Sequence, residues 1–263
     1  MIALFPSRAV ALELFGFSLH WYGLLYFTGF VLGYLLLPKL QRYRGLHYTK
    51  DEWSRLISWA VVGVIVGGRL GFVLFYEPSR YLADPLEAFA VWHGGMSSHG
   101  GFIGVVLCLW WALKHKKSDM ARVADTVVIP VAIGLALGRF GNFLNQELYG
   151  LPTTLPWGIR VPTEPGPVHP TQLYAIAKDL FIALVCSLHL RRPGSLTGRT
   201  CALFLMLYGV LRFLVEFLRV QEYAMVDLGF VALSRGQVMT VGIFIAGVVA
   251  WWWAGRAGKS RHY

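Results

Sequence analysis

One short stretch, GRFGNFLNQELYG, crowds five polar side chains at the end of an apolar segment. It runs from Gly138 to Gly150 and holds Arg139, Asn142, Asn145, Gln146 and Glu147. A guanidinium is suited to bidentate recognition of a phosphate, and Gly138 and Gly141 permit a close backbone approach beside it. The amide and carboxylate surroundings of Arg139 therefore favour a bound anion or an ordered polar network. The alternative is an arginine that snorkels to the membrane interface.

A second set of ionisable residues recurs at helical spacing in LFLMLYGVLRFLVEFLRV. Tyr208, Arg212, Glu216 and Arg219 fall on one face of a helix at this spacing. Arg212 and Glu216 can form an ion pair, and that pairing alone would explain the presence of both. Two arginines and a tyrosine that face inward are more typical of a lipid headgroup site.

Single ionisable residues mark three further positions. His99 lies between glycines in HGGMSSHGGFIG, and an imidazole, whose ordinary pKa is about 6.5, can accept a proton at neutral pH. A lone histidine at a helix start is often a structural hydrogen-bonding group instead. His169 is expected to position its neighbours. Asp125 is expected to be structural, either capping a helix or pairing with Arg122.

The elements that position these residues are apolar. The chain of 263 residues is 56% hydrophobic and only 14% charged, whereas soluble domains carry roughly 25% charged residues. Runs long enough for membrane helices lie at 18–38, 56–76, 98–113, 121–140, 170–190, 200–218 and 236–254. The sequence therefore predicts an all-α integral membrane protein, a bundle of about seven transmembrane helices with a small irregular head on the periplasmic side. Residues 1–263 are expected to form a single polytopic membrane domain.

The net charge of +10 is concentrated in short loops between the apolar runs. This distribution argues against a nucleic-acid partner and indicates orientation, with attraction to anionic lipid headgroups as a second role. The positive-inside rule predicts an external N-terminus and a cytoplasmic C-terminus. The connections 77–97 and 141–169 are then external and are expected to form the head.

Ionisable residues within membrane spans usually pair with one another or face a cavity. Most of those in this chain lie toward the external ends of their spans, so they are expected to converge on one outward-facing cavity. The ionisable residues within or beside the spans are Arg69, His99, Asp125, Arg139, Glu147, His169, Arg212, Glu216 and Arg219.

Other classes of site find little support in the sequence. Cys108, Cys186 and Cys201 lie in apolar runs without a CxxC pair, so free buried thiols are expected. No metal site and no cofactor is predicted. The first twenty residues lack a basic segment followed by a small-residue cleavage site, so no cleaved signal peptide is expected.

Several blocks together resemble the prolipoprotein diacylglyceryl transferase family of bacteria. They are HWYGLLY, GGRLGFVLFY, GGMSSHGG, GRFGNFLNQELYG, HPTQLY and YGVLRFLVEFLR, in the family's order across residues 16–250. The resemblance implies transfer of the diacylglyceryl group of phosphatidylglycerol to the lipobox cysteine thiol in the signal peptide of a prolipoprotein. The products would be a thioether and glycerol 1-phosphate. It also implies seven transmembrane helices in the bacterial inner membrane and a periplasmic active site.

The resemblance assigns the family's key residues to positions in this chain. The family's histidine corresponds to His99 and its essential arginines to Arg139 and Arg212. A thiol needs a base, for which we nominate His99, and the two arginines would stabilise the departing phosphate. The headgroup-binding and ordering set is Tyr26, Arg69, Asn142, Asn145, Glu147, Gly150, Tyr208, Glu216 and Arg219, with His169 and Gln172 as positioning residues.

Three positions depart from the family pattern. Ala175 follows HPTQLY where a glutamate is frequent, Ser98 precedes the HGG histidine where an aromatic residue is common, and Arg235 stands before GQ at the last span where a methionine is common. These departures bear on contacts with the peptide substrate. A transporter or channel for a small anionic solute is the competing function, and a different headgroup transferase is a third. A transporter would need a polar path to the inner side and paired broken helices, and the sequence has neither.

Overall fold

The computed structural model describes residues 10–14, 17–75, 77–90, 94–116, 119–221, 225–227, 229 and 232–259. The chain folds as two compact units, one made of Met1–Arg44 with Ala124–Tyr263 and the other of Gly45–Val123. We refer to them as the arginine unit and the glycine unit, after the residues that dominate each, and describe each by itself.

Helices lie at all seven of the predicted runs. They are α1 (Trp21–Leu40), α2 (Lys50–Phe75), α4 (Ser98–Ala112), α5 (Met120–Leu144), α6 (Thr171–Arg191), α7 (Arg199–Glu216) and α8 (Arg235–Lys259). Five of these, α1, α2, α5, α6 and α8, are long and apolar enough to cross a membrane, and α4 is a shorter apolar helix. The chain is therefore an all-α, multi-pass membrane protein, as predicted.

Two helix starts differ from the predicted runs. Residues 18–20 belong to strand β2 (Phe17–His20), which pairs antiparallel with β1 (Val10–Leu14), so α1 begins only at Trp21. Helix α2 begins at Lys50, before its apolar run, because Thr49 and Glu52 form a reciprocal capping box. The Glu52 carboxylate accepts from the Thr49 N–H at 2.9 Å, and the Glu52 N–H donates to the Thr49 hydroxyl at 3.2 Å.

The connections contain only short elements. The glycine unit has helix α3 (Pro78–Ala83) and the 3₁₀ turn η2 (Pro85–Phe89), and the arginine unit has the 3₁₀ turn η1 (Gln41–Arg44). Strands β3 (Ile159–Arg160) and β4 (Pro167–Val168) form one hairpin, and β5 (Val226–Asp227) and β6 (Ala232–Leu233) form another. The segment between α5 and α6 thus makes no long helix, as its proline and glycine content predicts.

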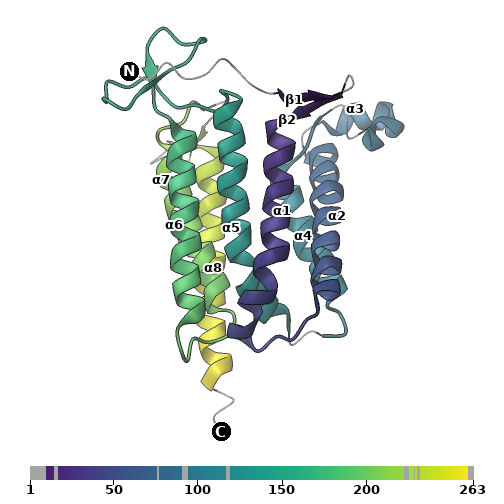
Figure 1. Ribbon diagram of the computed structural model, residues 1–263. Coiled ribbons are helices and arrows are strands. Elements are labelled where there is room, and N and C mark those ends of the chain that lie inside the picture. Colours follow the sequence, from purple (N-terminus) through teal and green to yellow (C-terminus); the bar gives the residue numbers. More distant parts are fainter. Residues whose placement is uncertain are drawn as a thin grey trace. The chain divides into compact units, whose positions relative to one another are not determined.

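Helices α5, α6, α7 and α8 of the arginine unit run side by side (Figure 1). Their shared core includes Ala132 of α5, Ile182 and Cys186 of α6, and Phe204 of α7, each at most 8% exposed. Helix α8 packs closely along α7, and Gly209 permits this because it has no side chain. A Cβ at Gly209 would lie only 2.9 Å from the Thr240 carbonyl oxygen. Helix α7, which carries Arg212, is therefore held in position by the helices packed around it.

A buried ion pair closes the end of the arginine unit at which α1 ends. The Arg44 side chain is 3% exposed, and its Nε lies 2.6 Å from Oδ2 of the fully buried Asp125. The same guanidinium donates to the Thr200 hydroxyl at 2.7 Å, and Asp125 accepts from the backbone N–H groups of Gly198 and Cys201 at 2.7 Å each. We call this group the Arg44 knot, and it joins α1, α5 and the connection between α6 and α7.

The Arg44 knot confirms a structural role for Asp125 but corrects its partner. The expected partner Arg122 lies 3.8 Å from Asp119 instead. Asp125 pairs with an arginine 81 residues earlier in the chain, a contact that local spacing does not reveal. Asp125 therefore has the structural role expected of it and lies in the knot rather than in the pocket of Arg139 and Arg212.

Helices α2 and α4 of the glycine unit meet through small residues. Gly63, Gly67 and Gly71 recur every fourth residue on α2 and face Gly100 and Gly104 of α4. A Cβ at Gly67 would lie 2.3 Å from the Gly100 carbonyl oxygen, so the two backbones are in direct contact. Stripes of this kind let membrane helices associate by close van der Waals packing.

We expect Gly67→Ala to lower the stability of the protein by about 1–3 kcal/mol, the usual cost of overpacking. The new methyl group would collide with the backbone of α4, which cannot move aside as a flexible side chain can. The matched control is Gly242→Ala in α8, where a Cβ meets nothing within 4 Å. Thermal unfolding in detergent measures both. Equal melting temperatures for the two variants would contradict the close contact of α2 and α4.

Candidate functional site

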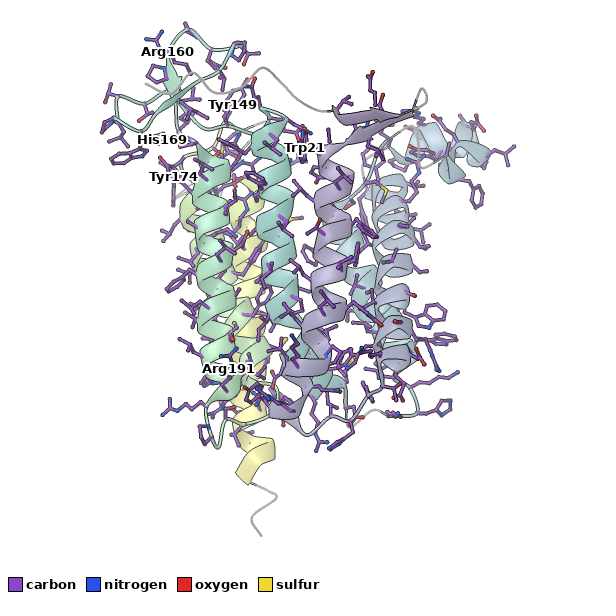
Figure 2. The ribbon with its side chains drawn as sticks, in the orientation of Figure 1. Trp21, Tyr149, Arg160, His169, Tyr174 and Arg191 are labelled. Atoms are coloured by element: carbon purple, nitrogen blue, oxygen red, sulfur yellow. The ribbon has the colours of Figure 1, made fainter. Side chains whose placement is uncertain are left out.

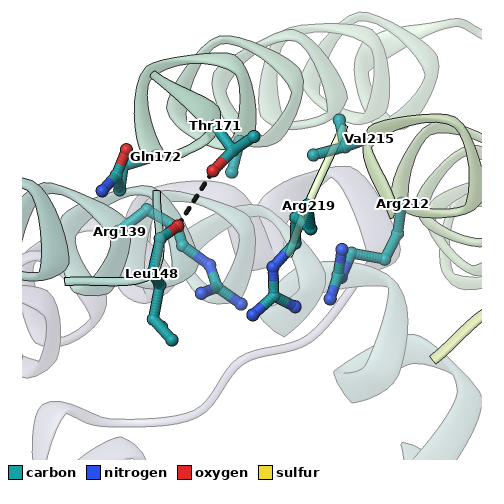
Figure 3. A pocket seen from close by; sticks show the side chains of 8 residues that line it. Arg139, Leu148, Thr171, Gln172, Arg212, Val215 and Arg219 are labelled. Carbon is teal, nitrogen blue, oxygen red and sulfur yellow. Dashed lines mark hydrogen bonds between the residues drawn. The ribbon is translucent and has the colours of Figure 1, made fainter. Parts of the chain in front are cut away.

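Three arginines of the arginine unit line one pocket. Arg139 comes from α5, Arg212 from α7, and Arg219 from just beyond the end of α7. Figure 3 shows their guanidinium groups in a row and pointing to the same side of the pocket. The remaining lining residues are Leu148, Thr171, Gln172, Ala175 and Val215. The enclosed space is narrow, about 10 Å³, which is room for roughly one water molecule.

Glu216 holds two of these arginines. Its carboxylate forms an ion pair with Arg212, as the sequence spacing predicts, and lies 3.4 Å from Nη1 of Arg219. Ser234 donates to its other oxygen at 3.2 Å. Gly236 leaves space for the carboxylate, because a Cβ there would lie 2.7 Å from Oε1. The Glu216 side chain is therefore enclosed on every side by groups that fix its position.

Arg139 is connected differently, through an amide. Its Nη1 donates to Oδ1 of Asn142 at 3.3 Å, and Nδ2 of Asn142 donates to Oε1 of Glu147 at 2.7 Å. Among the described residues Arg139 forms no direct ion pair. These hydrogen bonds form an ordered polar network, one of the two alternatives that the sequence left open, and they leave most of the Arg139 guanidinium available to another partner.

The charges of the cluster do not cancel. Arg139, Arg212 and Arg219 bring three positive charges, whereas Glu147 and Glu216 bring two negative charges, so one positive charge is left over. Burial, the charge of Arg212 and the charge of Arg139 all lower the pKa of Arg219, while Glu216 opposes them. An arginine stays protonated at neutral pH. The three guanidinium groups therefore repel one another, and a bound anion would reduce this repulsion.

The turn after α5 brings Arg139 and Arg219 together. Gln146 and Leu148 both adopt positive φ, 54° and 59°, which is uncommon for residues other than glycine. The turn leads to Gly150, whose N–H donates to the His169 carbonyl at 2.9 Å and which forms a β-bridge with Arg219. A Cβ at Gly150 would lie 2.2 Å from the Leu218 carbonyl oxygen. Only glycine fits this position between two backbones.

His169 contributes through its main chain as much as through its ring. Its N–H donates to the Leu151 carbonyl at 3.0 Å, and its carbonyl accepts from Gly150. The imidazole Nδ1 lies 3.2 Å from the Tyr174 hydroxyl, which also accepts from Trp157 at 2.8 Å. Figure 2 places His169 and Tyr174 together at the end of α6 that carries the β3–β4 hairpin. This arrangement fits the positioning role predicted for His169.

Two tyrosines of α1 lie against the glycines of α5. The Tyr26 ring lies over Gly138, and a Cβ at Gly141 would approach Cδ2 of Tyr22 to 2.8 Å. The two tyrosine hydroxyls are 3.2 Å apart. The glycines thus permit the close approach that was predicted, although side chains rather than backbone fill it. Tyr22 was not singled out in the sequence, although it lies in the same block as Tyr26.

Sequence reasoning also missed a buried ion pair in α6. Lys178 and Asp179 are paired, with side chains 6% and 2% exposed. The ammonium of Lys178 lies 4.5 Å from the centre of the Tyr208 ring, one helical turn before Arg212. Charged residues at adjacent positions within a predicted membrane span were the available signal. The pair places a second set of charges next to the arginine cluster and orients Tyr208.

Two buried acceptors near the cluster lack a hydrogen-bond donor among the described residues. They are Oδ1 of Asn145 and Oε1 of Gln172. Gln172 lines the pocket, and its Nε2 donates to the Glu147 carbonyl at 2.6 Å. Buried polar atoms normally have partners, so these two oxygens are free to accept hydrogen bonds from a molecule bound there.

Arg69 and His99 belong to the glycine unit, so their expected convergence with the arginine cluster stays a prediction. The Arg69 guanidinium donates to the carbonyls of Glu87, Ala88, Gly94 and Gly95, and lies 5.2 Å from the Tyr81 ring centre. It therefore organises the turn that precedes α4. His99 is the second residue of α4, and its side chain lies outside the described part of the structure, as does that of Ser98.

The chain is similar to known proteins over most of its length. The family model described as prolipoprotein diacylglyceryl transferase matches residues 9–253. A protein of Pseudomonas fluorescens strain Pf-5 named phosphatidylglycerol–prolipoprotein diacylglyceryl transferase is 42% identical over 250 residues, 93% of each chain. Proteins of the same name from Pseudomonas syringae pv. syringae and Pseudomonas paraeruginosa are each 40% identical. They cover 93% and 96% of this chain, and 92% and 95% of their own lengths.

We expect Lys178→Met to destabilise the protein by about 3–5 kcal/mol, because it leaves the Asp179 carboxylate buried without its partner. The double variant Lys178→Met/Asp179→Leu removes both charges and should recover most of this loss. Melting temperatures in detergent measure both variants. A double variant less stable than the single one would show that the pair is not a buried, mutually dependent unit.

Proposed function

This chain belongs to the prolipoprotein diacylglyceryl transferase family, and we propose that it transfers the diacylglyceryl group of phosphatidylglycerol to prolipoproteins. The acceptor in this proposal is the lipobox cysteine thiol of the signal peptide, and the products are a thioether and glycerol 1-phosphate. The observation that carries the proposal is the row of three guanidinium groups with one uncompensated positive charge. Its relatives favour a transferase over the transporter considered from the sequence.

The charge surplus matches the substrate. A phosphodiester such as that of phosphatidylglycerol carries one negative charge, so it neutralises the cluster. Arg139, which has no ion pair among the described residues, and Arg212 would bind the phosphate oxygens, as planar guanidinium groups do. The carboxylate of Glu216 holds both Arg212 and Arg219 in place. Neighbouring side chains must move apart to admit the headgroup, because the pocket itself holds only about 10 Å³.

The same arrangement favours the transition state over the bound lipid. The thiolate sulfur attacks the glyceryl carbon that bears the phosphate, the C–S bond forms, and the C–O bond breaks. The electron pair of that bond leaves with the phosphate, which becomes a monoester and gains a second negative charge. Fixed cations stabilise a charge that grows during the reaction. The three arginines therefore stabilise the transition state more strongly than the bound lipid.

The rest of the headgroup is a glycerol with two hydroxyl groups. Oδ1 of Asn145 and Oε1 of Gln172 are buried acceptors without a donor, and glycerol hydroxyls supply donors of the right kind. Tyr26, beside Arg139, and Tyr208, beside Arg212, would order the two arginines. Gly150 keeps the turn against Arg219.

The thiol must lose its proton, because a free thiol is only a few per cent ionised at neutral pH. We assign the base to His99, at the start of α4. Arg69 acts through the backbone in this proposal: its hydrogen bonds to the carbonyls of Glu87, Ala88, Gly94 and Gly95 fix the backbone before α4. Arg69 is thus a positioning residue rather than a phosphate ligand.

The proposed orientation follows from the basic loops, with the N-terminus outside, the C-terminus in the cytoplasm, and the active site on the periplasmic face of the inner membrane. A green fluorescent protein fused after Tyr263 should fluoresce, and alkaline phosphatase fused at the same position should stay inactive, because only the former folds to its active state in the cytoplasm. The reverse pattern of the two reporters would invert the topology.

Arg139→Ala and His99→Gln should each lower lipidation of a lipobox peptide by at least a hundredfold, because they remove transition-state charge stabilisation and the base. Both variants should remain in the membrane fraction. The assay follows transfer of radiolabel from phosphatidylglycerol to the peptide cysteine by the purified enzyme. Arg160→Ala, which removes an exposed arginine of β3, serves as the matched control and should retain activity. Normal thioether formation by either site variant would refute the role assigned to that residue.

A further inference from the structure

A second cavity of the arginine unit lies at the far end of α7 from Arg212. It encloses about 510 Å³ and is lined by Arg199, Val248, Trp251, Trp252, Gly255 and Arg256. We call it the α8 groove. Arg199 is the first residue of α7, so it lies roughly 20 Å along the helix from Arg212 at 1.5 Å per residue. The two sites are therefore separate.

The α8 groove is built from one face of α8 and the start of α7. Its α8 residues recur at spacings of three and four, which places them in one stripe along the helix. Arg256 lies over the Trp252 ring, 3.7 Å from its centre, and Arg199 lies 4.7 Å from the centre of the Trp251 ring. Gly255 leaves space for Arg199, because a Cβ there would be 2.9 Å from Nη2.

The two arginines of the groove are not neutralised. Within the described part of the chain neither Arg199 nor Arg256 forms an ion pair, and the Nε of Arg199 is buried without a hydrogen-bond acceptor. The walls between them are apolar and open outward, since Val248 is 44% and Trp252 50% exposed. An occupant must therefore combine a negative charge with a hydrocarbon body.

We infer that the α8 groove binds an anionic phospholipid, with its phosphate between Arg199 and Arg256 and an acyl chain along Val248 and Trp251. A free phosphate satisfies the guanidinium groups but leaves the apolar wall uncovered, so the lipid is the better occupant. Tryptophan and arginine at the end of a membrane span are typical of the interface at which such headgroups lie. The inference does not depend on the reaction at the arginine cluster.

The test counts lipids retained by the purified protein. Native mass spectrometry after incubation with phosphatidylglycerol or chain-matched phosphatidylcholine should show that Arg199→Gln/Arg256→Gln retains one anionic lipid fewer per chain than the wild type. Retention of phosphatidylcholine should be unchanged. Gly255→Leu, which keeps both charges but displaces the Arg199 guanidinium, should lose the same lipid. Both variants should keep transferase activity within about twofold, because the cluster around Arg139 and Arg212 is untouched.

The matched control is Arg191→Gln/Arg192→Gln, which removes two exposed arginines at the end of α6. It should retain anionic lipid as the wild type does. An equal loss in this control would show a general effect of charge and overturn the inference. So would unchanged retention in the groove variants, or complete displacement of the lipid by millimolar inorganic phosphate.

Discussion

The arginine unit is governed by the cost of enclosing charge within a membrane-spanning fold. Three guanidinium groups share a space with two carboxylates, and no described side chain cancels the last positive charge. Taking an ion out of water costs several kcal/mol unless a partner compensates it. Glu216 and Asn142 compensate part of this cost by binding the arginines, and Glu147 holds Asn142. In the proposed function the phosphate of the substrate compensates the rest. Under the same proposal, incomplete neutralisation is what gives this site its affinity for a phosphodiester.

Precise placement of the three arginines depends on a turn rather than on the helices alone. Arg139 lies in the last part of α5 and Arg219 follows the end of α7, so neither helix alone fixes their separation. The turn from Asn145 to Gly150 supplies that link, because Gly150 lies between the strands of backbone at His169 and Leu218. Lys178 and Asp179 support the cluster from α6 through Tyr208. Most of these contacts join residues at most five positions apart, and Tyr208 and Ser234 connect them to other segments.

The helices were predictable from sequence because hydrocarbon length and backbone hydrogen bonding leave few alternatives. The pairing of Arg212 with Glu216 was predictable because it is local. Asp125 was assigned to the wrong arginine because its partner Arg44 is distant in sequence. The positions of the apolar runs give the helices but not which residues of different helices are in contact. The start of α2 was missed because its capping box is polar. The roles of Arg69 in binding carbonyls, and of Lys178 and Asp179, depend on burial, which spacing alone does not give.

The Arg44 knot has a consequence for biosynthesis. The ribosome delivers Arg44 81 residues before Asp125 and 156 residues before Thr200. The guanidinium must therefore wait at the bilayer surface, in water or among headgroups, while the intervening segments emerge and insert. Only when α5 and the start of α7 are in place can it leave the aqueous phase. Formation of this contact is thus a late step of assembly, and Arg44 has neither of these partners in a chain that ends before α5.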